Sequence, residues 1–178
     1  MILAESRARF ADLRKTAEGA LAQVSDDEFF AFPEPSGETN SIALIVKHIA
    51  GNARSRWTDF LTSDGEKPDR NRDTEFERFE NDSRASLMAA WARGWDLVDA
   101  ALAPLSDADL ERTITIRGEP HTVSLALVRQ LAHYGQHVGQ IVLLARIARG
   151  KDWQTLSVPR GGTTAFNAKM GEAFPQKP

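Results

Sequence analysis

The chain has 178 residues, a formal net charge of −3 and no cysteine, which excludes disulfides, thiolate metal sites and cysteine nucleophiles and leaves histidine and carboxylate as strong metal ligands. Acidic and basic residues are interleaved along the chain, so no nucleic-acid partner is expected. Because no window approaches the roughly 18 apolar residues of a membrane span and the first residues lack the order of a signal peptide, we expect one cytoplasmic domain over residues 1–178, with no membrane partner.

The first predicted helix covers about residues 2–24. Its apolar side chains recur at steps of three and four residues, and charged side chains fall between them, which is typical of an amphipathic helix. The segment FPEPSGETN, residues 32–40, then interrupts helical structure with two prolines and a glycine. Either Asn40 or Ser41 is a suitable N-cap for a second helix.

The second predicted helix covers about residues 41–62 and has an isoleucine-rich apolar stripe. His48 lies beside this stripe, at the start of a polar line that runs along the helix. The other members of that line are Asn52, Ser55 and Asp59. The charged segment DRNRDTEFERFE, residues 69–80, follows as a connecting loop, and Phe76 and Phe79 are expected to anchor it to the body of the protein.

Two further helices are predicted, over about residues 83–103 and 123–149. Between them, the segment RTITIRGEPHTVS, residues 112–124, combines β-branched residues with a turn signal and predicts a small hairpin. The last helix is apolar around much of its circumference, which favours a central position or a subunit interface. The tail, residues 151–178, has irregularly spaced aromatic residues and is expected to pack over the bundle as an extension.

A pair of histidines four residues apart, His133 and His137, lies in the last helix. Residues i and i+4 share one face of a helix, so the two imidazoles could bind one metal ion, although packing or chance placement would give the same spacing. A third ligand from another helix would complete the three protein ligands of an open catalytic site. His48 is the best candidate, although a histidine at such a position, taken alone, is more often a core or boundary residue than a ligand.

The remaining polar candidates do not single out a catalytic residue. His121 is expected to be a loop or capping residue, with a role facing the substrate as the alternative. Gln140 falls on the same side of the helix as the histidine pair and could fix a histidine tautomer, whereas Tyr134 is expected to pack in the core. Asp59 and Glu119 could act as a carboxylate ligand or a base, but the pattern selects neither, so the catalytic residues remain unknown.

Three segments resemble the DinB/YfiT-like superfamily of metal-dependent four-helix-bundle proteins. They are NSIALIVKHIAGNARSRWTDFLTSDGEKPDRNRDTEFE, RQLAHYGQHVGQIVLLAR and WQTLSVPRGGTTAFN. Within the second, His133 to Gln140 form the pattern HxxxHxGQ. The resemblance covers nearly the whole chain, and it is strongest to a subgroup of bacterial proteins of unknown function.

The resemblance implies an all-α, up-down-down-up four-helix bundle that is commonly dimeric. It also implies a divalent metal ion held by His48, His133 and His137, which could be zinc, nickel, iron or manganese. Relatives include S-transferases and a maleylpyruvate isomerase that use a low-molecular-weight thiol. The function expected here is therefore a metal-dependent hydrolase or thiol S-transferase acting on a small molecule as a homodimer; the alternative is a non-catalytic, dimeric stress-response or small-molecule-binding bundle.

Overall fold

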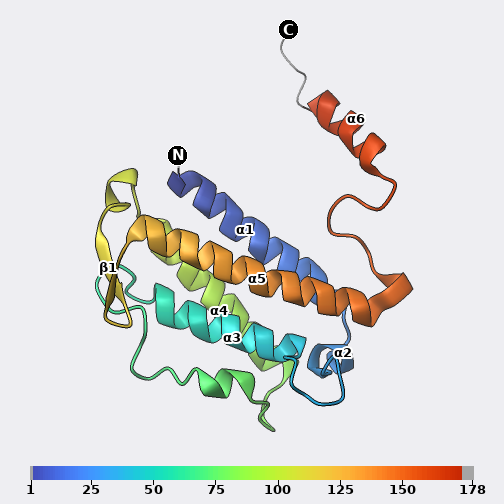
Figure 1. Ribbon diagram of the computed structural model, residues 1–178, viewed down its shortest axis with the longest axis horizontal. Helices are drawn as coiled ribbons and strands as arrows, with labels where there is room; N and C mark the ends of the chain where they lie inside the picture. The colour runs from blue at the N-terminus through green and yellow to red at the C-terminus, as the bar shows by residue number, and fades with distance from the viewer. Residues whose placement is uncertain (1, 174–178) are drawn as a thin grey trace.

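The computed structural model describes residues 2–173, and within them four long helices pack side by side (Figure 1). These helices are α1 (Ile2–Leu21), α3 (Ile42–Trp57), α4 (Arg84–Leu102) and α5 (Val123–Arg149). Helices α1 and α5 run in one direction, and α3 and α4 run in the opposite direction. The expected up-down-down-up bundle is confirmed. No helix of the described residues is long and apolar enough to cross a membrane.

Most helix ends lie where the capping residues predict them. The Ser41 side chain accepts a hydrogen bond from the Leu44 amide at the start of α3, and Ser83 and Thr122 cap α4 and α5 in the same way. Helix α3 ends at Trp57, earlier than predicted, because the backbone becomes extended and then left-handed at Asp59, where φ is 51°.

A short helix that was not predicted, α2 (Asp26–Phe30), follows α1. It begins with a capping box, in which Ser25 and Glu28 exchange hydrogen bonds between side chain and backbone. Its Phe29 is fully buried, so this turn of helix closes one end of the bundle.

The centre of the bundle is aromatic. Phe10 of α1 contacts Trp57 edge-on at 5.4 Å between ring centroids, and Trp95 of α4 contacts Tyr134 of α5 at 5.5 Å. Trp57 donates a hydrogen bond from Nε1 to the Tyr134 hydroxyl at 3.0 Å. Tyr134 therefore packs in the core, as expected, and burial raises the pKa of its hydroxyl.

The connection between α3 and α4, residues 58–83, runs back along the bundle because these two helices are parallel (Figure 1). It contains one turn of 3-10 helix, η1 (Asp73–Phe76). At its far end, Lys47 of α3 pairs with Asp82 at 2.8 Å. Phe76 stacks on the His48 ring at 4.8 Å, so this phenylalanine anchors the charged loop as predicted. The crossover thereby covers the part of α3 that carries His48.

The predicted hairpin consists of β1 (Thr113–Ile116) and β2 (Glu119–Thr122), which pair antiparallel. Its two-residue turn has positive φ angles at Arg117 (57°) and Gly118 (75°), as in a type I′ turn. The Asp64 carboxylate of the crossover accepts hydrogen bonds from both backbone amides of that turn, each at 2.8 Å. The tip of the hairpin is therefore held against the crossover.

His121 was expected in a loop or a helix cap. It lies instead in β2, and its side chain is buried. Its Nδ1 donates to the Glu119 carbonyl oxygen at 3.0 Å, and its Nε2 accepts a hydrogen bond from Arg129 at 2.9 Å. The alternation of side chains along a strand directs His121 inward, which the short sequence pattern did not reveal.

The tail contacts the bundle at its beginning and then leaves it. After the 3-10 turn η3 (Gly150–Asp152), Gln154 exchanges hydrogen bonds of 2.8 and 3.0 Å with Gln23, which follows the end of α1. Helix α6 (Thr163–Ala173), which was not predicted, has no buried residue and stands away from the bundle (Figure 1). Residues 174–178 lie outside the described part of the chain.

Candidate functional site

Three histidines meet between α3 and α5. His48 Nε2 lies 3.2 Å from His133 Nε2, and His137 Nε2 lies 3.1 Å from the same atom. The three candidate ligand atoms all lie within 4.8 Å of one another. His133 and His137 are one turn apart on α5, and His48 faces them from the neighbouring α3, where it is almost completely buried. The structure thus brings together the three predicted ligands.

Hydrogen bonds made by the Nδ1 atoms, on the side away from the cluster, fix the tautomers of two of these imidazoles. His48 Nδ1 donates to Glu75 Oε2 at 2.8 Å, and His137 Nδ1 donates to Gln140 Oε1 at 2.7 Å. A neutral imidazole that donates through Nδ1 has a lone pair on Nε2. With both rings in this neutral form, two lone pairs point towards His133 Nε2, which can offer at most one proton. The cluster has an excess of acceptors, which a cation would satisfy.

The environment keeps the imidazoles of His133 and His137 uncharged. Burial lowers the pKa of His133 to about 3, with His137 and His48 as further causes. Burial also lowers the pKa of His137, and the hydrogen bond to Gln140 opposes that shift in part. Neutral imidazole is the form that binds metal ions, so His133 and His137 need not lose a proton near neutral pH.

Glu75, which sequence analysis did not identify, is the buried partner of His48. Burial by itself would raise the pKa of this carboxyl, but hydrogen bonds from His48 and Arg70 outweigh it, and the pKa is lowered. Arg70 donates to both Glu75 oxygens, at 2.8 and 2.9 Å. A Cβ atom at Gly51 of α3 would overlap Glu75 Oε1, so this glycine is what lets the carboxylate approach the helix. The only sequence signal for Glu75 was the neighbouring anchor Phe76.

The distances suit a metal ion. Three imidazole nitrogens bound tetrahedrally to one zinc ion at about 2.0–2.1 Å would lie roughly 3.3–3.4 Å apart. The two measured distances from His133 Nε2, 3.2 and 3.1 Å, are close to that value. Within residues 2–173 the group of potential ligands consists of these three histidines. The cluster could therefore hold a metal ion and leave a coordination position open.

A polar cavity of about 380 Å³ lies against the three histidines. Asn52 and Gln130 line it as a buried pair, joined by a hydrogen bond of 2.7 Å. Its lining also includes five arginines: Arg56, Arg70, Arg72, Arg117 and Arg129. The sequence did not single out these arginines, because they come from α3, the crossover, the hairpin turn and α5, and meet only in the folded chain.

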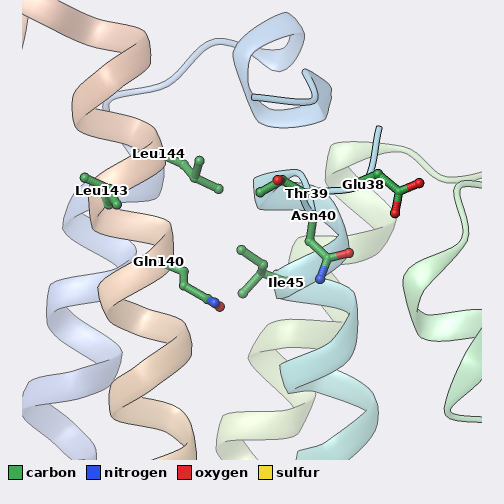
Figure 2. Close-up of a pocket in the computed structure, with 7 residues that line it drawn as sticks. All are labelled: Glu38, Thr39, Asn40, Ile45, Gln140, Leu143 and Leu144. Atoms are coloured by element: carbon green, nitrogen blue, oxygen red, sulfur yellow. The ribbon is translucent and has the colours of Figure 1, made fainter. Parts of the chain in front are cut away.

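A second cavity, of about 420 Å³, lies between α5 and the start of α3. Figure 2 shows Gln140 of α5 directed towards Ile45 of α3, with Leu143 and Leu144 on the same side of the cavity. Gln140 also contacts His137 Nδ1, as its position on the helix predicted. This glutamine therefore stands between the histidine cluster and a more apolar cavity.

The two carboxylates considered from the sequence lie away from the histidine cluster. Asp59 is exposed in the turn after α3, and Glu119 is exposed on β2; neither lines the polar cavity. Glu75 is the carboxylate that reaches the cluster instead.

A family model described as a protein of unknown function, DUF1572, matches residues 1–162. The matched segment contains all three histidines, Glu75 and the five arginines of the cavity. No curated protein matches the chain. Since the family model covers the whole bundle with its hairpin, this chain belongs to the DUF1572 family of proteins of unknown function.

Proposed function

We propose that this protein binds one divalent metal ion through the Nε2 atoms of His48, His133 and His137, and that it is a metal-dependent enzyme acting on a small molecule. The observation that carries the proposal is the convergence of these atoms, with two lone pairs directed at His133 Nε2. A metal ion with three protein ligands and an open position can lower the pKa of a bound water or thiol, or polarise a carbonyl group.

Such a metal site is compatible with both hydrolysis and thiol transfer. The resemblance to the DinB/YfiT-like superfamily favours the same three ligands and makes a low-molecular-weight thiol a candidate co-substrate. Zinc, nickel, iron and manganese are the candidate ions, because imidazole binds several first-row metals and availability helps to decide among them. The cavity beside the histidines has the size of a small-molecule site, at about 380 Å³.

Metal content tests this function directly. Protein purified without an affinity tag is expected to bind about one zinc ion per chain, measured by elemental analysis and by titration of the chelated protein. Zinc at about 100 times its dissociation constant should raise the free energy of unfolding by roughly 2.7 kcal/mol. If the chelated protein took up no stoichiometric metal, the proposal would be wrong.

Thermal melting with and without chelator distinguishes a bundle that binds metal from one whose histidines serve only packing. In a bundle whose histidines serve only packing, chelator should leave the melting temperature unchanged. In the proposed enzyme, the metal-free protein should remain folded, because the ring contacts of Phe10 with Trp57 and of Trp95 with Tyr134 do not involve the metal ligands, and only the metal contribution to stability should be lost.

We also propose that a second copy of the chain covers one face of α5, which is apolar and exposed. Its large apolar side chains are 53–65% exposed in the single chain: Leu125, Val128, Leu143 and Ile147. They fall within one sector of the helix, with Gly135 and Gly139 among them, so a second helix could approach closely. Light scattering should give a mass twice the 19.7 kDa of one chain. A monomer at micromolar concentration would contradict this arrangement.

A further inference from the structure

We propose that the polar cavity beside the three histidines binds its ligand through an anionic group, a carboxylate or a phosphate, and that Arg72, Arg117 and Arg129 hold this group. The binding of the anion follows from the arginines themselves. Its role as a substrate rests on the proposed function, because only then does the ligand lie beside a reactive metal ion.

The cavity has an excess of positive charge. Five arginines line it, and no aspartate or glutamate of the described residues does. Four carboxylates lie behind or beside the lining: Glu66, Glu75, Asp64 and Glu119, whose Oε2 lies 3.8 Å from His121 Nε2. Five guanidinium groups thus face four carboxylates, none of which lines the cavity itself. A cleft lined by charge of one sign attracts ligands of the opposite sign.

Glu66 cannot neutralise the arginines around it. Its single Oε2 atom lies 2.8 Å from Arg56, 3.4 Å from Arg70 and 3.2 Å from Arg117. One carboxylate oxygen thus serves three guanidinium groups, each of which has five N–H donors. In addition, Arg56 Nε is buried and has no hydrogen-bond partner among the described residues. The donors on this side of the cavity outnumber the acceptors that the protein supplies.

Three arginines keep donors that no carboxylate occupies. Arg72 makes no ion pair within residues 2–173, and its guanidinium lies over the Phe76 ring, 5.0 Å from the centroid. Arg129 uses one nitrogen for the hydrogen bond with His121, and Arg117 contacts Glu66 only through Nε. Planar guanidinium groups bind carboxylates and phosphates through paired hydrogen bonds, which suits an oxyanion at this position.

The fold holds two of these arginines in place before any ligand binds. The hairpin turn that carries Arg117 is fastened by the Asp64 carboxylate through two backbone amides, each at 2.8 Å. Arg129 is held by His121, which is itself fixed to the Glu119 carbonyl oxygen. The hairpin therefore does more than connect α4 to α5, because its turn and its His121 hold Arg117 and Arg129 at the cavity.

A cavity of about 380 Å³ has the size of a small-molecule site. Its uncharged wall, the Asn52 and Gln130 pair, can hydrogen-bond hydroxyl or carbonyl groups. We infer a small anionic ligand whose charged group lies at the arginines and whose reacting group faces the histidines.

An NMR titration that follows the arginine Nε–H resonances tests this site. The probes are inorganic phosphate and succinate, added to metal-free and to zinc-loaded protein. Saturable shifts are expected at Arg72, Arg117 and Arg129, and the anion that binds more tightly identifies the preferred group. Arg117→Gln and Arg129→Gln should each weaken binding about tenfold, because each removes a charge-assisted hydrogen bond.

Arg146→Gln is the matched control, since Arg146 is also exposed on α5 but does not line the cavity. Its affinity for both anions should equal that of the original chain. Equal affinity in all three variants, or no saturable binding of either anion, would overturn the inference. Zinc binding without anion binding would overturn the anion site and leave the metal-dependent function standing. Anion binding without zinc binding would support the anion site and contradict the metal-dependent function.

Discussion

Replacement of His48 with alanine is expected to weaken zinc binding more than about 100-fold. The loss of an outer partner of a metal ligand alone costs roughly 10–100-fold in affinity, and the loss of a ligand should cost more. His48 supplies the nitrogen from α3, so its removal leaves only the two imidazoles of α5. Competition with a chromophoric chelator measures the affinity, and elemental analysis measures occupancy in the purified variant.

Two further variants make this result interpretable. His137→Ala should have a similar effect, and because His137 is only partly buried, this variant separates loss of a ligand from loss of folding. His121→Gln should leave zinc affinity unchanged, since the fourth histidine contacts Arg129 rather than the cluster. Circular dichroism should show the same helix content in all three. Full zinc occupancy in folded His48→Ala protein would argue against the site with three ligands.

The second largest effect is expected from the carboxylate behind His48. Glu75→Gln keeps an acceptor for His48 Nδ1 but removes the negative charge, and it should weaken zinc binding about 10–100-fold. Gly51→Ala should do the same without changing any charge, because the added methyl group occupies the space of Glu75 Oε1 and displaces the carboxylate from His48. The measurement is again zinc affinity by chelator competition.

These two variants differ in what else they disturb. Glu75→Gln also leaves the buried Arg70 without its anionic partner and should lower stability, whereas Gly51→Ala retains both charges. Gly171→Ala is the control, because a Cβ atom at that helical glycine meets nothing within 4 Å. In both test variants the NMR signals of His48 should report a mixture of tautomers. An unchanged tautomer with unchanged affinity would show that Glu75 does not position His48.

Local sequence signals were sufficient to predict most of the helices. The predicted range 123–149 matches α5 because Thr122 caps it and Gly150 follows it with a positive φ of 53°. The hairpin was recognisable from its β-branched strand and its glycine turn at residues 117–118. Helix α2 was missed because five residues are too few for an apolar period to show, and α6 was missed because it buries no side chain.

The three candidate metal ligands could be predicted from the sequence for a different reason. The spacing of His133 and His137 depends only on helix geometry, and His48 could be added because histidines are few in this chain. Neither Glu75 nor the arginines of the cavity gave such a signal. Glu75 lies in a segment with many charges, and nothing local distinguishes the carboxylate that becomes buried from those that remain in water.

The sequence by itself determined the helical periods, their caps, the hairpin and the three candidate ligands, because these depend on contacts between residues close in the chain or on rare residue types. Only the tertiary structure decided that the crossover returns over α3, which buries Glu75 beside His48, and that the hairpin delivers Arg117 and holds Arg129. Burial and charge pairing across the bundle arise from segments far apart in the sequence, so the arginine-lined cavity exists only in the folded protein.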